Sequence, residues 1–250
     1  MTPALETAGL SKSFGALVVA RDIGFRLDAG ARHALIGPNG AGKTTFVNLI
    51  TGRIAPSAGR VLLGGTDITA LGQAERVKRG LVRTFQITTL FKGLSALENV
   101  ALAVGEREGQ GGDILGRGGP SPAVVEEAFD LLAALGLAPE VERPVKELAY
   151  GRQRLVEIAL ALALKPKVLL LDEPAAGVPA DESALIFKAI EGLPTDIAIL
   201  IIEHDMEIVF RFARKITVLV QGQVLREGTP ADIAADPEVR AVYLGEAGRG

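Results

Sequence analysis

The stretch that decides the fold of this chain lies near its start and reads Gly37, Pro38, Asn39, Gly40, Ala41, Gly42, Lys43, Thr44 and Thr45. It matches the pattern G-x-x-x-x-G-K-[ST] at every fixed position. The apolar run at 32–36 before it suits a buried strand, and the apolar residues at 46–50 after it suit the first turns of a packed helix. A glycine-rich turn with a chance lysine would need neither neighbour. The sequence therefore predicts a phosphate-binding loop between a strand and a helix.

The composition of such a loop explains its chemistry. Glycines let the backbone curl so closely that successive N–H groups point at the oxygens of a polyphosphate. The start of the following helix adds the positive end of its dipole. We expect Lys43 to reach the β- and γ-phosphates and the hydroxyl of Thr44 to ligate Mg²⁺.

Composition limits the classes of protein to consider. The chain has 250 residues, of which 48% are hydrophobic and 23% charged, so it can bury a full core. A net charge of −3 disfavours binding to nucleic acid, and the lack of cysteine excludes disulfides and thiolate metal sites. The first residues do not resemble a signal peptide, and no apolar run approaches the roughly 20 residues that cross a bilayer. These features predict a soluble cytoplasmic protein that meets a membrane only through a partner.

Strands and helices alternate along the chain. Residues 10–27 predict a hairpin, and the short apolar runs 168–171 and 196–202 predict strands buried on both faces. Apolar residues at helical spacing predict a helix that ends at Pro166, with Leu155, Ile158, Ala159 and Leu162 on its buried face. The glycine-rich segment 105–122 predicts a flexible loop; its arginines lack the aromatic partners of an RNA-binding segment. The pattern predicts an α/β core with a largely parallel sheet.

Polar residues follow three of the predicted strands. Asp172 and Glu173 come directly after the strand at 168–171, at the end where parallel sheets bind ligands. Asp172 suits Mg²⁺, and Glu173 suits a water molecule that it orients and deprotonates. His204 ends the next buried strand, where it would hydrogen-bond a γ-phosphate. Gln86 ends the strand predicted at 80–86, where its amide would ligate Mg²⁺ or hold the attacking water. A solvated turn is the alternative for the two carboxylates.

Together these residues resemble the nucleotide-binding subunit of ATP-binding-cassette (ABC) transporters over nearly the whole chain. The resemblance assigns ATP and Mg²⁺ as cofactors and places Phe14 against adenine. Lys43, Gln86, Glu173 and His204 correspond to residues that act in catalysis. The family signature LSGGQ corresponds here to Leu148, Ala149, Tyr150, Gly151 and Arg152.

The resemblance also implies an architecture and partners. It implies one cassette domain spanning 1–250, with a phosphate-loop NTPase core of mostly parallel sheet, an antiparallel β subdomain and an inserted helical subdomain at about 88–160. Two such subunits would complete the ATP sites between them, phosphate loop against signature. Integral-membrane permease subunits would hold the protein on the inner face of the membrane, through the segment 86–100. The apolar residues there, Leu90, Phe91, Leu94 and Leu97, suit a docking patch or a core equally.

Within the family the chain is most similar to the ATPases of branched-chain amino-acid importers, which act with a substrate-binding protein. The segments VRTFQITTLF, LAYGRQRLVEIA, LDEPAAGV and IIEHDM carry this likeness. The alternatives within the family are the ATPase of a urea or amide importer, the lipopolysaccharide-export ATPase and a soluble ABC ATPase without a permease. Outside the family the alternative is a nucleotide kinase.

Two motifs depart from the family pattern. The signature serine is Ala149 and the signature glutamine is Arg152, which adds positive charge. The aspartate expected before the next helix is Pro179, with Asp181 two residues on. Both departures concern the contact between two subunits.

Overall fold

The computed structural model describes residues 2–84, 90–110 and 119–247. These divide into two compact units. The first comprises Met1–Arg83, Lys167–Glu173 and Thr195–Gly250, and the second comprises Thr84–Pro166 and Pro174–Pro194.

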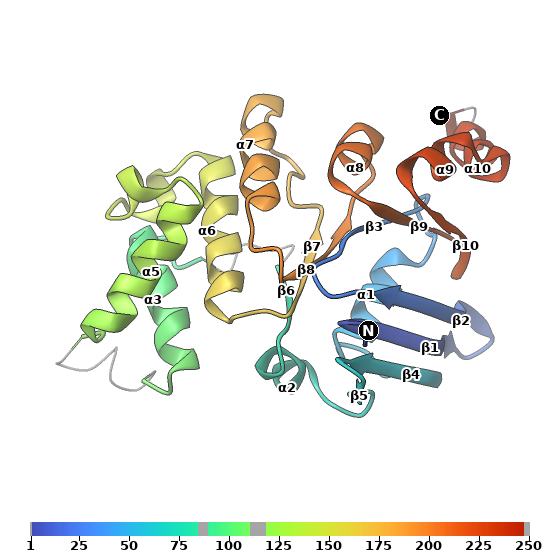
Figure 1. Ribbon diagram of the computed structural model, residues 1–250, viewed down its shortest axis with the longest axis horizontal. Coiled ribbons are helices and arrows are strands. Elements are labelled where there is room, and N and C mark those ends of the chain that lie inside the picture. The colour runs from blue at the N-terminus through green and yellow to red at the C-terminus, as the bar shows by residue number, and fades with distance from the viewer. Residues whose placement is uncertain (1, 85–89, 111–118, 248–250) are drawn as a thin grey trace. The chain divides into compact units, whose positions relative to one another are not determined.

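The centre of the first unit is a sheet in which six strands of the described chain follow the order β10-β9-β3-β8-β7-β6 (Figure 1). All neighbours in it are parallel except β10, which pairs antiparallel with β9 at the edge. Its strands are β3 (Arg32–Ile36), β6 (Leu81–Arg83), β7 (Val168–Asp172), β8 (Ala198–Ile202), β9 (Lys215–Val220) and β10 (Gln223–Gly228). Because β3, β7 and β8 are parallel, the residues that follow them gather at one edge of the sheet.

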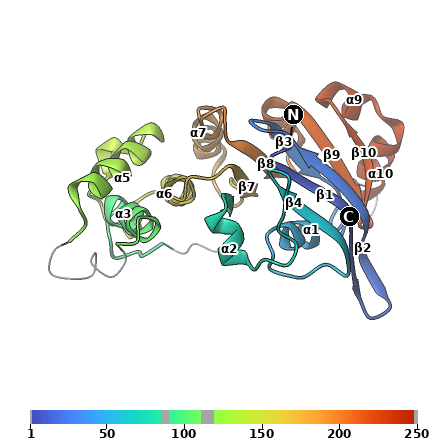
Figure 2. The same ribbon diagram turned by 60° about the horizontal axis from the view of Figure 1, so that its bottom comes forward.

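A second, antiparallel sheet belongs to the same unit, and its strands within the described residues follow the order β2-β1-β4-β5. They are β1 (Leu5–Phe14), β2 (Leu17–Leu27), β4 (Ala58–Leu63) and β5 (Thr66–Asp67). Helix α1 (Lys43–Ile50) lies beside these strands (Figure 2). Its buried residues Phe46, Val47, Leu49 and Ile50 share one apolar core with both sheets. The remaining helices of this unit are α2 (Gln73–Lys78), α8 (Met206–Phe212), α9 (Pro230–Ala235) and α10 (Pro237–Ala247).

The second unit is helical. It contains α3 (Ala96–Arg107), α5 (Pro122–Ala134), α6 (Tyr150–Ala163), α7 (Ala180–Glu191) and the short 3-10 helices η1 (Ala138–Glu140) and η2 (Val145–Glu147). Helices α3, α5 and α6 contact one another, and α7 packs on α6 (Figure 1). The apolar face expected on α6 is buried at all of its positions, Leu155, Ile158, Ala159 and Leu162. Because α7 groups with these helices, the unit extends beyond the range of about 88–160 expected for a helical insertion.

The structure confirms the α/β fold with its antiparallel and helical parts, and it corrects one detail. The loop predicted from residue 105 begins later, because α3 continues to Arg107. The Arg107 guanidinium donates hydrogen bonds to Glu127 and Glu108 and to the carbonyl of Ala163, so it belongs to the packing of the helices. Residues 111–118 of that segment lie outside the described residues.

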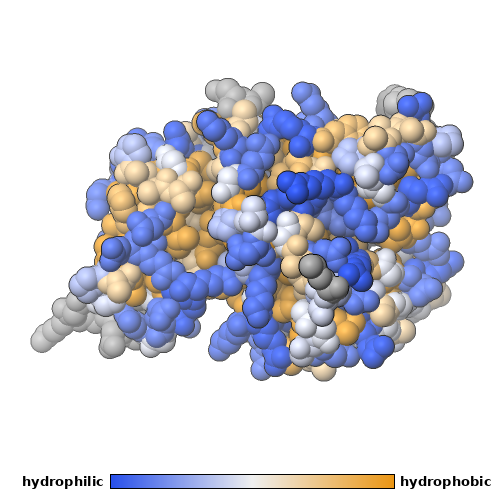
Figure 3. Space-filling view, in the orientation of Figure 1, coloured by the Kyte–Doolittle hydropathy of each residue, from blue (hydrophilic) through white to orange (hydrophobic). Residues whose placement is uncertain are grey.

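The apolar residues expected near residue 90 differ in their burial. Leu90 is buried, whereas the side chain of Phe91 is 61% exposed. Leu94 and Leu97 are half-buried. Figure 3 shows further apolar surface over the helices of this unit. Among the described residues, no helix combines the length and the apolar character that crossing a membrane requires.

Candidate functional site

The phosphate-loop sequence connects β3 to α1, as predicted. Gly37 follows β3 so closely beside β9 that a Cβ there would lie 2.2 Å from the carbonyl oxygen of Leu219. Gly42 caps the start of α1 with a φ of 99°, in the left-handed region that favours glycine. The loop thus needs glycine at these two positions for space and for backbone conformation.

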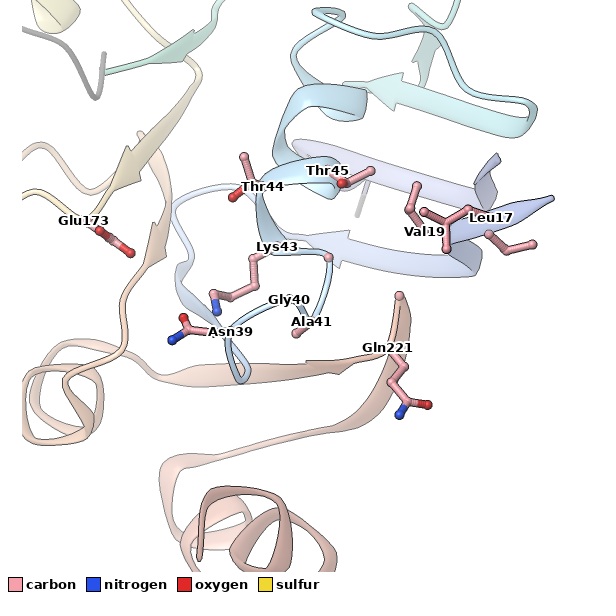
Figure 4. Close-up of a pocket in the computed structure, with 13 residues that line it drawn as sticks. Leu17, Val19, Asn39, Gly40, Ala41, Lys43, Thr44, Thr45, Glu173 and Gln221 are labelled. Atoms are coloured by element: carbon pink, nitrogen blue, oxygen red, sulfur yellow. The ribbon is translucent and has the colours of Figure 1, made fainter. Parts of the chain in front are cut away.

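A pocket of about 470 Å³ opens over this loop. Its lining comes from the start of β2, the phosphate loop, the end of β7 and the β9–β10 turn, and consists of Leu17, Val18, Val19, Asn39, Gly40, Ala41, Gly42, Lys43, Thr44, Thr45, Glu173, Gln221 and Gly222. Figure 4 shows the apolar β2 residues on one side of the loop and Glu173 on the other. The pocket therefore offers an apolar end, a backbone cradle and a carboxylate.

Lys43 contributes a positive charge to the loop. Its Nζ donates hydrogen bonds to the carbonyl oxygens of Gly37, at 2.5 Å, and Pro38, at 3.0 Å. In Figure 4 the side chain points toward Asn39 and away from the β2 residues. The ammonium group at the loop, together with the helix start at Lys43, suits a bound polyphosphate.

The ends of β7 and β8 bring Glu173 and His204 together. Asp172 pairs in register with Ile202, and the N–H of Glu173 donates to the carbonyl of Ile202 at 2.9 Å. Glu173 has a φ of 47°, unusual for a residue other than glycine. Its Oε1 lies 3.8 Å from His204 Nδ1. The two residues expected to act on the attacking water and the γ-phosphate are therefore neighbours.

Glu203 adds a second carboxylate close to His204. Its side chain is buried, its Oε2 accepts a hydrogen bond from the backbone N–H of His204, and the same oxygen lies 3.8 Å from His204 Nδ1. Burial raises the pKa of the Glu203 carboxyl above its ordinary value.

Asp172, expected to ligate Mg²⁺, is held by Arg83 at the end of β6. The guanidinium forms an ion pair with the carboxylate of Asp172 and donates a second hydrogen bond to Asn48 Oδ1 at 3.0 Å. Both partners of the ion pair are largely buried.

The oxygen donors of this region fit Mg²⁺. The hydroxyl of Thr44 and the carboxylate of Asp172 are hard oxygen ligands, the kind that Mg²⁺ prefers, and Mg²⁺ is commonly bound by one or two protein groups together with substrate phosphates. Within the described residues, no group of three or more histidines or carboxylates could hold a metal by itself. The residues present thus suit a cation that arrives with phosphate.

The other predicted site residues lie elsewhere. Phe14 ends β1 with a 55% exposed side chain, and it is not among the residues that line the pocket. Lys12 Nζ lies 5.0 Å from the centroid of its ring. Gln86 lies outside the described residues. Leu148, Ala149, Tyr150, Gly151 and Arg152 belong to the helical unit.

The signature residues form the start of α6. Ala149 is the N-cap of that helix and forms no side-chain capping hydrogen bond. Instead, Glu182 Oε2 accepts a 2.6 Å hydrogen bond from the N–H of Gly151. Arg152 is paired: its Nε lies 3.4 Å from Glu140 Oε2, and it donates to the carbonyl of Gly136. The extra positive charge expected of Arg152 is therefore partly neutralised.

Sequence analysis missed several residues of the site. Leu17, Val18, Val19, Gln221 and Gly222 line the pocket because the β1–β2 and β9–β10 hairpins both approach the loop. The N–H of Gly222 donates to the carbonyl of Ala41 at 2.8 Å. Hairpin ends carry no motif of their own, so their sequence held no signal for this role.

Comparison with known proteins identifies the family. The sequence pattern described as "ABC transporter" matches residues 20–176, and the one described as "Branched-chain amino acid ATP-binding cassette transporter" matches residues 223–249. The chain belongs to the ABC transporter family, as an ATP-binding cassette. The ABC resemblance seen in the sequence is confirmed, and the chain is accordingly an ATPase subunit of a transporter.

Individual relatives align with this chain over nearly their whole length. The high-affinity branched-chain amino acid transport ATP-binding protein BraF of Pseudomonas aeruginosa is 37% identical over 98% of this chain and 99% of its own. The corresponding protein LivG of Escherichia coli is 37% identical over 98% and 99%. A crystal structure of an ATP-binding cassette of an ABC transporter in its ADP conformation superposes with a TM-score of 0.86, at 33% identity, covering 98% of this chain and 100% of that one.

Proposed function

We propose that the pocket over the phosphate loop binds ATP with Mg²⁺ and that Glu173 directs hydrolysis of the γ-phosphate. The observation that supports this most is that Glu173 lines the same pocket as the whole segment from Asn39 to Thr45. A carboxylate at one side of a phosphate cradle lies where an attacking water would be held. Leu17, Val18 and Val19 offer apolar contact for the base of the nucleotide.

Each residue then has one task. The loop amides and Lys43 hold the phosphates, and Thr44 and Asp172 provide oxygen ligands for the cation. Bound Mg²⁺ would neutralise charge on the phosphates. Glu173 orients the water and accepts its proton, His204 hydrogen-bonds the γ-phosphate, and Gln86 contacts the cation or the water. Phe14 lies at the end of the β1–β2 hairpin, and we assign it a stacking contact with adenine.

We further propose that hydrolysis requires a second ATPase subunit. Apart from the N–H of Gly151, which donates to Glu182, the start of α6 offers its backbone N–H groups to an anion. By family resemblance that anion is the γ-phosphate of ATP bound at the phosphate loop of a partner subunit. Ala149 lacks the hydroxyl that would add a contact, and Pro179 has neither a carboxylate nor a backbone N–H. Each lost hydrogen bond to a charged group weakens binding by roughly 1.5–3 kcal/mol. A different partner would confine both defects to one of the two sites, so we favour a heterodimer.

The test of pairing is sedimentation of the purified Glu173→Gln protein with excess Mg-ATP. Slow hydrolysis in this variant preserves any ATP-bound dimer, so a stable homodimer would be detected. We expect mostly monomer at low micromolar concentration, because Ala149 and Pro179 weaken both sites of a homodimer. A tight ATP-dependent homodimer would contradict the heterodimer. Association only after a second ATPase subunit is added would support it.

The names of the relatives support a class of transported substrate. BraF and LivG are named for high-affinity branched-chain amino acid transport. We propose that this chain drives uptake of branched-chain or related amino acids, bound to permease subunits on the cytoplasmic face of the membrane and fed by a substrate-binding protein.

Reconstitution tests the transport function. The chain would be co-expressed with the permease, binding-protein and second ATPase subunits of a branched-chain amino acid importer, and the complex placed in vesicles. We expect ATP-driven uptake of labelled leucine, which Glu173→Gln abolishes. Uptake of urea instead would replace the substrate class, and failure to assemble with any permease subunit would favour a soluble ABC ATPase.

A further inference from the structure

Arg83 connects three elements of the first unit. It is the last residue of β6, and it pairs in parallel register with Leu170 of β7. This register directs its guanidinium to Asp172, the last residue of β7, while its other terminal nitrogen donates to Asn48 on α1. One side chain therefore connects β6, β7 and the helix that follows the phosphate loop.

The position of Asn48 makes this bridge relevant to the cation. Asn48 lies four residues after Thr44 in α1, so the two side chains share one face of the helix, one turn apart. Thr44 and Asp172 are the oxygen donors that fit Mg²⁺. The bridge therefore joins α1, which carries the donor Thr44, to the side chain of Asp172, which is the second donor.

Burial makes the bridge rigid. The side chains of Arg83 and Asp172 are 10% and 8% exposed. Arg83 Nε is buried and has no hydrogen-bond partner among the described residues, so the guanidinium is held by its two terminal nitrogens. The planar fork of arginine serves two separate acceptors with fixed geometry, whereas the ammonium of lysine is a single point on a flexible stem.

We propose that Arg83 is a positioning residue that sets the separation between Thr44 and Asp172 and so tunes how strongly Mg²⁺ enhances nucleotide binding. This inference rests on the proposed binding of Mg-nucleotide in the pocket. Arg83 does not contact the phosphates in this scheme. It acts through Asp172, by tying that carboxylate to the face of α1 that bears Thr44.

Calorimetric titration with ADP tests the proposal without relying on turnover. The dissociation constant would be measured with millimolar Mg²⁺ and again with excess EDTA, and the ratio of the two taken as the Mg²⁺ enhancement. For Arg83→Lys, which keeps the charge, we expect the enhancement to fall roughly tenfold, the scale of one lost hydrogen bond to a charged group. The dissociation constant in EDTA should stay within about twofold of the wild-type value, because the backbone cradle is unchanged.

Three further variants complete the test, and Asn48→Ala keeps it decisive if Arg83→Lys folds poorly. Asn48→Ala breaks the same bridge without touching the ion pair, and its enhancement should fall in the same direction. Arg79→Lys changes an exposed arginine at the end of α2 and is the matched control. The double variant Arg83→Lys/Asn48→Ala should lose less than the sum of the single losses, because both changes break one connection.

The possible failures are distinct. If the wild-type chain binds no ADP, the proposed function fails. If it binds ADP with an Mg²⁺ enhancement that Arg83→Lys and Asn48→Ala leave unchanged, the function stands and the positioning role is wrong. Equal weakening of ADP binding with Mg²⁺ and with EDTA would also overturn it, since Arg83 would then support the fold or the cradle in general.

Discussion

Glu182 Oε2 accepts a 2.6 Å hydrogen bond from the backbone N–H of Gly151. The two residues come from α7 and α6, and the carboxylate lies at the positive end of the α6 dipole. This contact supplies a cap that Ala149, lacking a side-chain oxygen, does not provide. The start of α6 is therefore capped from a helix about thirty residues further on, although this carboxylate does not replace the hydroxyl that would meet a partner's γ-phosphate.

Gly151→Ala should destabilise the helical unit. A Cβ at this position would lie 2.5 Å from Glu182 Oε2 and 2.9 Å from Glu182 Cβ, so rotation of the carboxylate alone does not relieve the overlap. Overpacking of this kind costs about 1–3 kcal/mol. We would measure the free energy of unfolding in urea. The double variant Gly151→Ala/Glu182→Ala should recover part of the loss, and a Gly151→Ala chain as stable as wild type would contradict the packing described.

Lys43→Ala should abolish ATP turnover. The Nζ of Lys43 lies at the phosphate loop, and its removal takes away the side-chain charge that would contact the β- and γ-phosphates. Phosphate release would be measured at saturating Mg-ATP, with Lys78→Ala, a change of an exposed lysine, as control. Near wild-type turnover in Lys43→Ala would remove the basis for the phosphate-loop assignment.

Glu173→Gln should bind ATP and hydrolyse it slowly. Glutamine keeps the shape of the side chain but cannot accept a proton, and loss of a general base slows a reaction roughly 10²–10⁴-fold. Binding of ATP and the single-turnover rate would be measured on the same protein. If affinity collapses while the rate per bound ATP is unchanged, Glu173 is a binding residue instead.

His33 should make stability depend on pH. Burial lowers the pKa of His33 to about 4 from 6.5. Below pH 6.5 the imidazole of His33 is protonated in the unfolded chain, whereas in the folded chain it stays neutral down to about pH 4. The contribution of His33 to the free energy of unfolding is therefore fully present above pH 6.5 and is lost as the pH falls from 6.5 to 4. The loss by pH 5 is roughly 2 kcal/mol.

A glutamine at position 33 isolates this effect. His33 Nε2 lies 2.8 Å from Thr217 Oγ1, which itself donates to Glu227 Oε2, so Nε2 carries the proton of the neutral ring. Glutamine offers a similar donor without a titration. Urea unfolding at pH 5 and pH 7 should show a larger loss for wild type than for His33→Gln. Glu203, whose raised pKa acts in the opposite direction, is common to both proteins, so equal losses would refute the assignment to His33.

The sequence alone determined the family and the α/β class, and it predicted the residues that gather at one edge of the sheet. Lys43, Asp172, Glu173 and His204 each follow or belong to a motif whose spacing ties it to the end of a buried strand. Parallel strands gather their carboxyl ends at one edge, so local order along the chain was enough to bring Glu173 and His204 together, at 3.8 Å.

Only the tertiary structure decided the residues that act through partners far away in sequence. The Arg83–Asp172 pair joins positions 89 residues apart and depends on the pairing of β6 with β7. Glu182 reaches Gly151 because α7 packs on α6, and the two pocket hairpins approach the loop through sheet contacts. Motifs record chemistry that backbone spacing fixes locally, whereas ion pairs and caps of this kind are set by which buried surfaces pack together, and the one-dimensional pattern does not contain that information.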